Sequence, residues 1–245
     1  MTVAIDAGTT VRELVGRYPQ TRHVFEEHGI DYCCGGGRSL REVAEKSGAE
    51  LPTLVADLET SLAARGGSLE TSMPDWYATS LGELVDHILQ VHHTYTKDSL
   101  PRIRALVSKV RAAHGTQHGE MLRQVQGLFE ALDAELSEHL MKEEQTLFPY
   151  IVATEAHARG QSTSLPLTCF GTVRSPIHQM EHEHDSAGRT LEMLRQVTGN
   201  YRLPDDACPT FAAMYDELQQ LEADLHQHIH LENNILFPRA MELEG

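Results

Sequence analysis

Two segments of the chain repeat the same order of metal-binding residue types. HLMKEEQTLFP begins at His139 and HIHLENNILFP begins at His228, and a Glu follows each His by four positions, at Glu143 and Glu232. Residues four apart lie on one face of an α-helix, so each His and Glu can be directed at the same point. Imidazole and carboxylate form a mixed nitrogen and oxygen ligand set, which suits iron or manganese better than calcium. The repeat therefore predicts a metal site with two similar halves, and we expect iron.

Both pairs continue a stripe of apolar residues at helical spacing, which marks the face of a helix directed at a protein core. The two stripes are Val125, Phe129, Leu132, Leu136, His139, Glu143, Leu147 and Phe211, Met214, Leu218, Leu221, Leu225, His228, Glu232, Leu236. Burying a charge without a partner is costly. A bound metal is the compensation that this pattern predicts.

Two other predicted helices each contribute one His to an apolar face. His184 continues its stripe, whereas His182 falls off it. His93 continues the better stripe of the first long helix, but His92 is adjacent and periodicity does not exclude it. A single core His is more often a hydrogen-bonded structural residue than a metal ligand. Here six ligand-type residues lie on four facing stripes, and this combination favours metal binding instead.

The spacing of these residues shows an internal duplication. His228 follows His139 by 89 residues, and His184 follows His93 by 91 residues. The first two long helices therefore resemble the last two, related in a bundle by a pseudo-twofold axis. Two iron ions, each with two His and sharing both Glu, would still lack ligands. We expect an oxo or hydroxo bridge and room for oxygen or nitric oxide.

Other polar residues near the stripes are predicted to have lesser roles. Glu144 and Glu183 lie close to the site by spacing, and we expect them to be solvated or to support the ligands from outside. His226 and His230 should flank the stripe or be solvated, because each lies two residues from His228, about 200° around the helix and so off its face. The repeated Leu-Phe-Pro is expected to pack and to end each helix.

The segment DYCCGGGRSL is the second informative stretch. A bridge between Cys33 and Cys34 would be strained, because adjacent Cα atoms are about 3.8 Å apart and disulfides need roughly 4.4 to 6.8 Å. A Gly-rich turn and a helix capped by Ser39 follow, and their amide groups favour thiolate. A redox, nitrosyl-accepting or metal-passing pair and a simple turn are equally compatible with the sequence. Cys169 and Cys208 show no partner and are predicted to be inert or buried.

Caps and breakers divide the chain into a small helical domain at 1–66, a linker at 67–79 and a larger helical domain at 80–245. Capping boxes at Thr10 and Ser39 begin two of the short helices. Four long amphipathic stretches, at about 80–113, 118–153, 175–199 and 207–241, predict an all-α up-down-up-down bundle. The segment from Thr154 to Arg174 is long for a bundle connection.

Charge limits the partners that the chain can have. The 36 acidic residues outnumber the 20 basic ones, for a net charge of −16, which argues against nucleic acid and against an anionic membrane surface. The sequence has neither an apolar run of membrane-spanning length nor the pattern of a signal peptide, so we expect a cytoplasmic protein. Four cysteines, two of them adjacent, fit a reducing compartment.

The order of these motifs resembles the repair of iron centres (RIC) family. DYCCGGG, HLMKEEQTLFP, EHEHDSAG and HIHLENNILFP follow one another as in that family, and the resemblance covers nearly the whole chain. It implies a small domain with a Cys-Cys motif joined to a hemerythrin-like di-iron bundle. The iron ligands that it implies are His93, His139, Glu143, His184, His228 and Glu232, with His93 chosen over His92.

The resemblance further implies a stress protein that restores iron-sulfur clusters damaged by nitric oxide or peroxide. We expect iron donation from a labile centre bridged by Glu143 and Glu232, with Cys33 and Cys34 assisting metal or nitrosyl transfer. Its partners would be damaged iron-sulfur proteins, and it would be a monomer or a homodimer. The alternatives are a module that binds or senses nitric oxide or oxygen, and an enzyme that reduces nitric oxide or peroxide.

Overall fold

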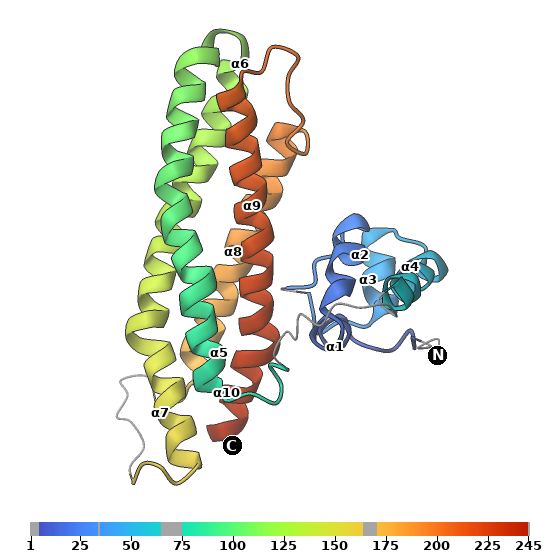
Figure 1. The fold of residues 1–245 in the computed structure, drawn as a ribbon, viewed down its shortest axis with the longest axis vertical. Helices are drawn as coiled ribbons and strands as arrows, with labels where there is room; N and C mark the ends of the chain where they lie inside the picture. Colours follow the sequence, from blue (N-terminus) through green and yellow to red (C-terminus); the bar gives the residue numbers. More distant parts are fainter. Residues whose placement is uncertain (1–4, 34, 65–74, 164–170, 245) are drawn as a thin grey trace.

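The computed structural model describes residues 5–33, 35–64, 75–163 and 171–244 of the 245-residue chain. These residues form helices, and the only strand-like pairing among them is one isolated bridge between Thr10 and Ser39. A long helical bundle stands beside a small helical domain (Figure 1). The predicted all-α fold, a four-helix bundle preceded by a small domain, is confirmed.

Four short helices and a 3₁₀ turn make up the described part of the small domain. These are α1 (Val11–Arg17), η1 (Pro19–Thr21), α2 (Arg22–Glu27), α3 (Leu40–Ser47) and α4 (Leu51–Ala64). Both predicted capping boxes are present: Thr10 pairs with Glu13 at the start of α1, and Ser39 pairs with Glu42 at the start of α3. The helices enclose a core that includes the fully buried Leu40, Leu54 and Leu58.

The bundle contains four rods, three of which include a π-helical turn. The elements are α5 (Leu81–His87), η2 (Ile88–His93), α6 (Thr94–Lys142), η3 (Glu143–Leu147), α7 (Phe148–Ala158), α8 (Arg174–Thr198), α9 (Pro209–Leu231), η4 (Glu232–Leu236) and α10 (Phe237–Glu244). The first rod runs directly into the second, because α6 is broken only at His118, whose backbone is not helical. Arg104 pairs with Asp133 and Arg111 with Gln126 across this reversal, so the two rods are antiparallel.

The prediction that Leu-Phe-Pro ends each helix is wrong. After Leu147 the second rod continues as α7 to Ala158, and after Leu236 the fourth continues as α10 to Glu244. The π turn explains this, because Phe148 donates its N–H to the carbonyl of Glu143 five residues earlier. The next residue, Pro149, has no N–H to donate. It follows directly after the π turn, where a missing backbone hydrogen bond destabilises the helix least.

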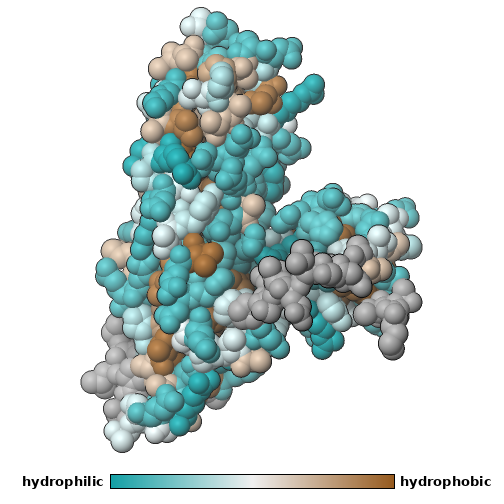
Figure 2. Space-filling view, viewed as in Figure 1, coloured by the Kyte–Doolittle hydropathy of each residue, from teal (hydrophilic) through white to brown (hydrophobic). Residues whose placement is uncertain are grey.

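The bundle core is split into two apolar layers. One surrounds Ile103, Phe129 and Leu218, and the other surrounds Ile88, Phe148 and Phe237. The six predicted ligands fall between these layers along every rod, so a buried polar layer separates two apolar ones. The face of the molecule drawn in Figure 2 is mostly hydrophilic, as expected when the apolar stripes are turned inward. Among the described helices, none is long and apolar enough to cross a membrane.

The small domain packs against α9 and η4 of the bundle (Figure 1). Ile229 of α9 joins the apolar core of the small domain. Arg22 donates a hydrogen bond of 2.7 Å to Gln227. Asn234 donates from Nδ2 to the backbone carbonyls of Tyr32 (3.3 Å) and Cys33 (3.0 Å). The segment before the Gly-rich turn is therefore fixed on the bundle by its backbone.

Candidate metal centre

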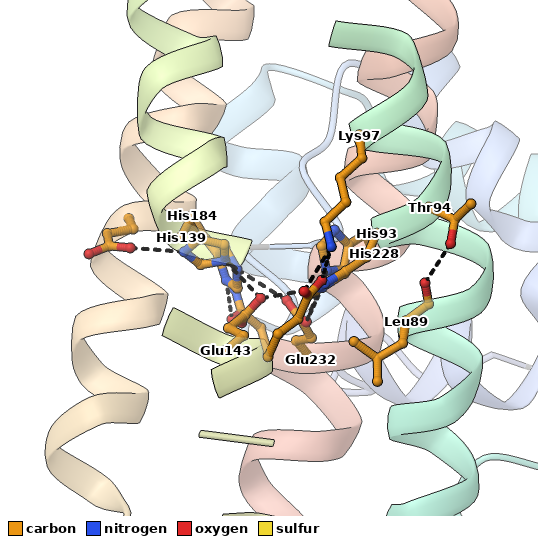
Figure 3. Close-up of polar contacts among 12 residues, drawn as sticks. Leu89, His93, Thr94, Lys97, His139, Glu143, His184, His228 and Glu232 are labelled. Carbon is orange, nitrogen blue, oxygen red and sulfur yellow. Dashed lines mark hydrogen bonds and ion pairs between the residues drawn. The ribbon is translucent and has the colours of Figure 1, made fainter. Parts of the chain in front are cut away.

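The structure brings all six predicted ligand residues together in the polar layer of the bundle. Each is between 0 and 3% exposed. They come from all four rods, with π turns at three of them (Figure 3). His93 ends η2, while Glu143 and Glu232 begin η3 and η4. π turns often occur at functional sites, because the extra residue changes the direction of the side chains that follow.

The six side chains form two overlapping groups that share both carboxylates. The first group contains His93 and His228, and the second contains His139 and His184; Glu143 and Glu232 belong to both. Within each group, one ligand atom from every residue lies within 4.8 Å of the others. Figure 3 shows the two His pairs on either side of the two Glu side chains. This is the arrangement that the duplicated sequence predicts.

Each carboxylate spans the two His pairs. Glu143 Oε2 lies 3.4 Å from Nε2 of His93 and 3.3 Å from Nε2 of His139. Glu232 places Oε1 2.9 Å from Nε2 of His228 and Oε2 3.2 Å from Nε2 of His184. Each Glu side chain therefore lies within reach of both His pairs.

A second ring of polar groups holds the outer nitrogen of three of the four His side chains. The contacts are His93 Nδ1 to Glu144 (2.8 Å), His139 Nδ1 to Glu183 (2.9 Å) and His184 Nδ1 to Asn233 Oδ1 (2.8 Å). Each acceptor fixes the ring so that Nε2 faces the centre, as is usual for metal-binding His. The expectation that Glu144 and Glu183 lie near the site is confirmed, and both support ligands from outside.

Without metal, the contacts between His139 and the buried carboxylates shift the pKa of this imidazole. Burial lowers the pKa of His139, but the neighbouring Glu143 and Glu183 outweigh burial and raise that pKa to about 10. Burial likewise raises the pKa of Glu232, yet His228 and His184 lower it well below the usual value for Glu. A metal ion would displace a proton from such an imidazole, because His binds metal in its neutral form.

The donor set fits a metal on geometric grounds as well. Both oxygens of Glu143 are buried and accept no hydrogen bond from the described residues, although the side chain is 0% exposed. Burying a carboxylate without a partner is costly. Four inward-facing imidazole nitrogens and two buried carboxylates are a borderline set that suits iron or manganese.

The neighbouring histidines lie outside the ligand set. His92 donates from Nδ1 to Oδ1 of Asp224 at 2.9 Å, and His93, not His92, belongs to the buried His and Glu cluster. His226 is half-buried, but His230 is only 3% exposed and contacts both Tyr32 and Asn234. The expectation that His230 could be solvated is wrong, because the small domain covers it. Burial lowers its pKa to about 4.

The two cysteines that the structure describes, Cys33 and Cys208, differ in burial and in the partners of their thiols. Cys33 is 4% exposed, and its thiol lies 3.0 Å from Oδ1 of Asp31, to which it donates. Cys34 and Cys169 lie outside the described residues. Cys208 is half-buried at the start of α9, where a hydrogen bond with His114 lowers the pKa of its thiol to about 7. The structure does not support the prediction of an inert thiol for Cys208.

Two contacts were missed by the sequence analysis. Asn233 supports His184, and its signal was available: it follows Glu144 by 89 residues, the same interval that separates the two repeated segments. The contact of Asn234 with the Cys33 carbonyl had no such signal, because it joins two domains through the backbone of one of them.

The fold and the buried His and Glu cluster define a cation-binding bundle of the hemerythrin type. The family model described as the hemerythrin HHE cation binding domain matches residues 84–240, and ScdA_N, a domain of unknown function, matches residues 7–62.

Similar proteins extend over both domains. A "Probable iron-sulfur cluster repair protein" of Haemophilus influenzae is 36% identical over 94% of this chain and 95% of its own length. The "Iron-sulfur cluster repair protein YtfE" of an Enterobacter species is 35% identical over 94% of both chains. The YtfE protein of Yersinia pseudotuberculosis is 35% identical over 92% of this chain and 93% of its own. The chain belongs to this family of iron-sulfur cluster repair proteins, which confirms the resemblance found in its sequence.

Proposed function

We propose that this protein repairs damaged iron-sulfur clusters by donating iron from a carboxylate-bridged di-iron centre. The observation that carries the proposal is the pair of overlapping ligand groups, in which Glu143 and Glu232 each contact both His pairs. The repair role is supported by relatives named for iron-sulfur cluster repair that match nearly the whole chain. The damaged cluster proteins would be its partners, and the cytoplasm its location.

The ligand set suits a donor because it holds iron incompletely. Each ion would have two imidazoles and two shared carboxylates, fewer than the six ligands that iron commonly takes. The remaining positions suit an oxo or hydroxo bridge and exchangeable small ligands. Apolar layers border the centre on both sides along the bundle. An incompletely held ion can be passed on, which a closed structural site would prevent.

Cys33 and Cys34 are proposed to assist transfer of iron or of a nitrosyl group. The backbone of Cys33 is fixed against η4 by Asn234, and its thiol is almost fully buried. Transfer through this thiol therefore requires the cysteine segment to open. The bundle and the small domain would separate locally at Asn234 when a client binds.

A second function, binding of nitric oxide or oxygen, is favoured by one observation. A small cavity of about 10 Å³ touches His139, His184 and His228, and apolar side chains including Leu136 and Leu225 form part of its wall. Such a cavity has a volume close to that needed by one water-sized molecule beside the centre. In that case the irons would stay in place, as they would in a reductase.

Iron content and iron transfer test the proposal. Protein purified without oxygen should contain close to two irons per chain, and the double variant His139→Ala, His228→Ala should lose most of them. The loaded wild type is then mixed with an enzyme whose [4Fe–4S] cluster has been damaged with nitric oxide.

The balance of iron separates the three functions. A donor loses iron in proportion to the enzyme activity recovered. A binding module takes up nitric oxide and keeps its iron. A reductase that is supplied with an external electron donor consumes many equivalents of nitric oxide without losing iron. Equal zinc, or no metal, in wild type and double variant would contradict a di-iron centre.

A further inference from the structure

The two halves of the centre differ in the support given to their His ligands. Three of the four rings have an acceptor for Nδ1 on a neighbouring rod, as described above. His228 is the exception: its Nδ1 is buried and has no hydrogen-bond partner in the part of the chain that the structure describes. The difference falls on one half, because His228 pairs with His93.

The internal duplication identifies the residue that causes this difference. Glu183 directly precedes His184 and reaches across to support His139. The equivalent residue in the first half lies 91 positions earlier, directly before His93, and it is His92. By the same symmetry, residue 92 faces His228. The duplicated site therefore has a carboxylate at one of the two equivalent positions and an imidazole at the other.

The geometry of His92 shows that it does not replace the missing acceptor. Its ring stacks on the ring of His228, with 4° between the planes and 5.6 Å between the centroids. Its Nδ1 is directed instead at Asp224, 2.9 Å away. Stacked rings cannot share an in-plane hydrogen bond, so the Nδ1 of His228 stays without one.

We propose that the iron held by His93 and His228 leaves the centre before the iron held by His139 and His184, and that His92 sets this order. A metal-bound imidazole is oriented and made more basic by an acceptor at its other nitrogen, and losing that acceptor typically weakens metal binding 10- to 100-fold. The inference rests on the proposed di-iron centre and assigns its two halves different tasks: one iron is donated and the other keeps the site assembled.

The less supported half also faces the small domain. His92 lines a cavity of about 40 Å³ between the two domains, together with His87 and His230 of the bundle and Arg22 of the small domain. Iron that leaves from beside His228 therefore starts next to the domain that carries Cys33. The better supported half contacts α8, which lies on the other side of Glu143 and Glu232 (Figure 3).

Release of iron to a chelator tests the order. The full chain is loaded without oxygen to two ferrous ions, its iron content is measured, and it is mixed with an excess of ferrous chelator in a stopped-flow spectrometer. We expect two phases of equal amplitude, with rates about 10- to 100-fold apart. One phase that releases both irons would overturn the inference while leaving the di-iron centre intact. A chain that binds no iron at all would instead contradict the proposed function.

The variant His92→Gln tests the cause. Its side-chain oxygen can accept from Nδ1 of His228, as Asn233 accepts from His184, and it adds no charge beside Asp224. The fast phase should slow about tenfold or more while the slow phase stays unchanged. A fast phase that is unchanged or faster would overturn the role of His92. A variant that merely disturbs folding would speed release, the opposite of the expected result.

Two variants on the other half provide matched controls. Glu183→Gln weakens the acceptor for His139, and Asn233→Ala removes the acceptor for His184. Both should speed the slow phase and leave the fast phase unchanged. If either speeds only the fast phase, the assignment of the phases is overturned, even if His92→Gln fails to fold.

Discussion

The ligand layer of the bundle and the cysteine segment of the small domain are both buried, but different contacts hold them. In the ligand layer, every contact joins one side chain to another, and four imidazoles, one from each rod, surround two carboxylates. The cysteine segment is held by its backbone, through two carbonyls that accept from Asn234. The layer therefore depends on residue identity at six positions, whereas the segment depends on one amide of the bundle and on close backbone approach.

The largest effect is expected from breaking the ligand layer. Replacing Glu232 by Ala removes the carboxylate between His184 and His228, so both halves lose a ligand. Iron affinity should fall by more than the 10- to 100-fold typical of an outer partner. Elemental analysis of protein purified without oxygen measures the loss. Glu144→Gln, which changes only an outer acceptor, is the control and should retain more iron; full iron content in Glu232→Ala would contradict the site.

The ligand layer should also make the metal-free protein sensitive to alkali. The pKa of His139 is about 10 in the folded state and 6.5 without perturbation, so its charge stabilises the fold fully below pH 6.5 and progressively less toward pH 10. The pKa of Glu183 is lowered to about 2, so its contribution is present above pH 4.5 and lost on acidification toward pH 2.

Urea unfolding of the metal-free chain between pH 3 and pH 10 measures the loss of stability at both ends of this pH range. The alkaline loss should be reduced in His139→Gln, and the acidic loss in Glu183→Gln. The cysteine segment offers no comparable signal, because its contacts to Asn234 involve backbone carbonyls that do not titrate. An equal loss of unfolding free energy at alkaline pH in His139→Gln and in the wild type would contradict this account.

An intermediate effect is expected from releasing the cysteine segment. Asn234→Ala leaves the carbonyls of Tyr32 and Cys33 without their donor, which should cost about 1 to 3 kcal/mol of stability. Cys33 should react faster with a thiol reagent, as followed by tandem mass spectrometry. Gln124→Ala, which removes an exposed amide from α6, is the control. Unchanged labelling of Cys33 would show that Asn234 does not hold the segment.

The smallest effect is expected from replacing a glycine by alanine. Two such variants distinguish a close approach of the backbone to the bundle from ordinary helix propensity. A Cβ on Gly36 would lie 2.4 Å from Oδ1 of Asn234, so Gly36→Ala should push the segment away and cost about 1 kcal/mol. A Cβ on Gly188 of α8 meets nothing within 4 Å, and Gly188→Ala should add about 0.5 to 1 kcal/mol. The midpoint temperatures of thermal unfolding of the two variants should therefore shift in opposite directions. A gain in Gly36→Ala would contradict the close approach.

Periodicity predicted the ligand layer well because the bundle is regular. Placing His139 and Glu143 on one face needs only the pitch of a helix, and the repeat at His228 and Glu232 supplies the second half. The π turns were not predictable in this way. Two of them lie at the Leu-Phe-Pro segments and the third lies at Ile88–His93, and a period of 3.6 residues contains no sign of any of them.

Contacts between the domains could not be predicted from the sequence, for a different reason. His230 falls off the bundle stripe, and a single-helix argument must therefore direct it toward solvent. The structure buries it because Tyr32, almost 200 residues away, covers it. Helical spacing describes one element at a time, so a residue that faces another domain is not distinguished from one that faces water.

The turn η4 has a thermodynamic consequence. It supplies three consecutive side chains with three separate duties: Glu232 contacts the two His pairs, Asn233 holds His184, and Asn234 holds the small domain. One backbone turn thus takes part in two binding equilibria, that of metal and that of the docked domain. Any free energy by which metal at Glu232 favours docking must equal the free energy by which docking favours metal. A client that detaches the cysteine segment from Asn234 would weaken iron binding by the same factor, so recognition of the client and release of the iron would be reciprocal.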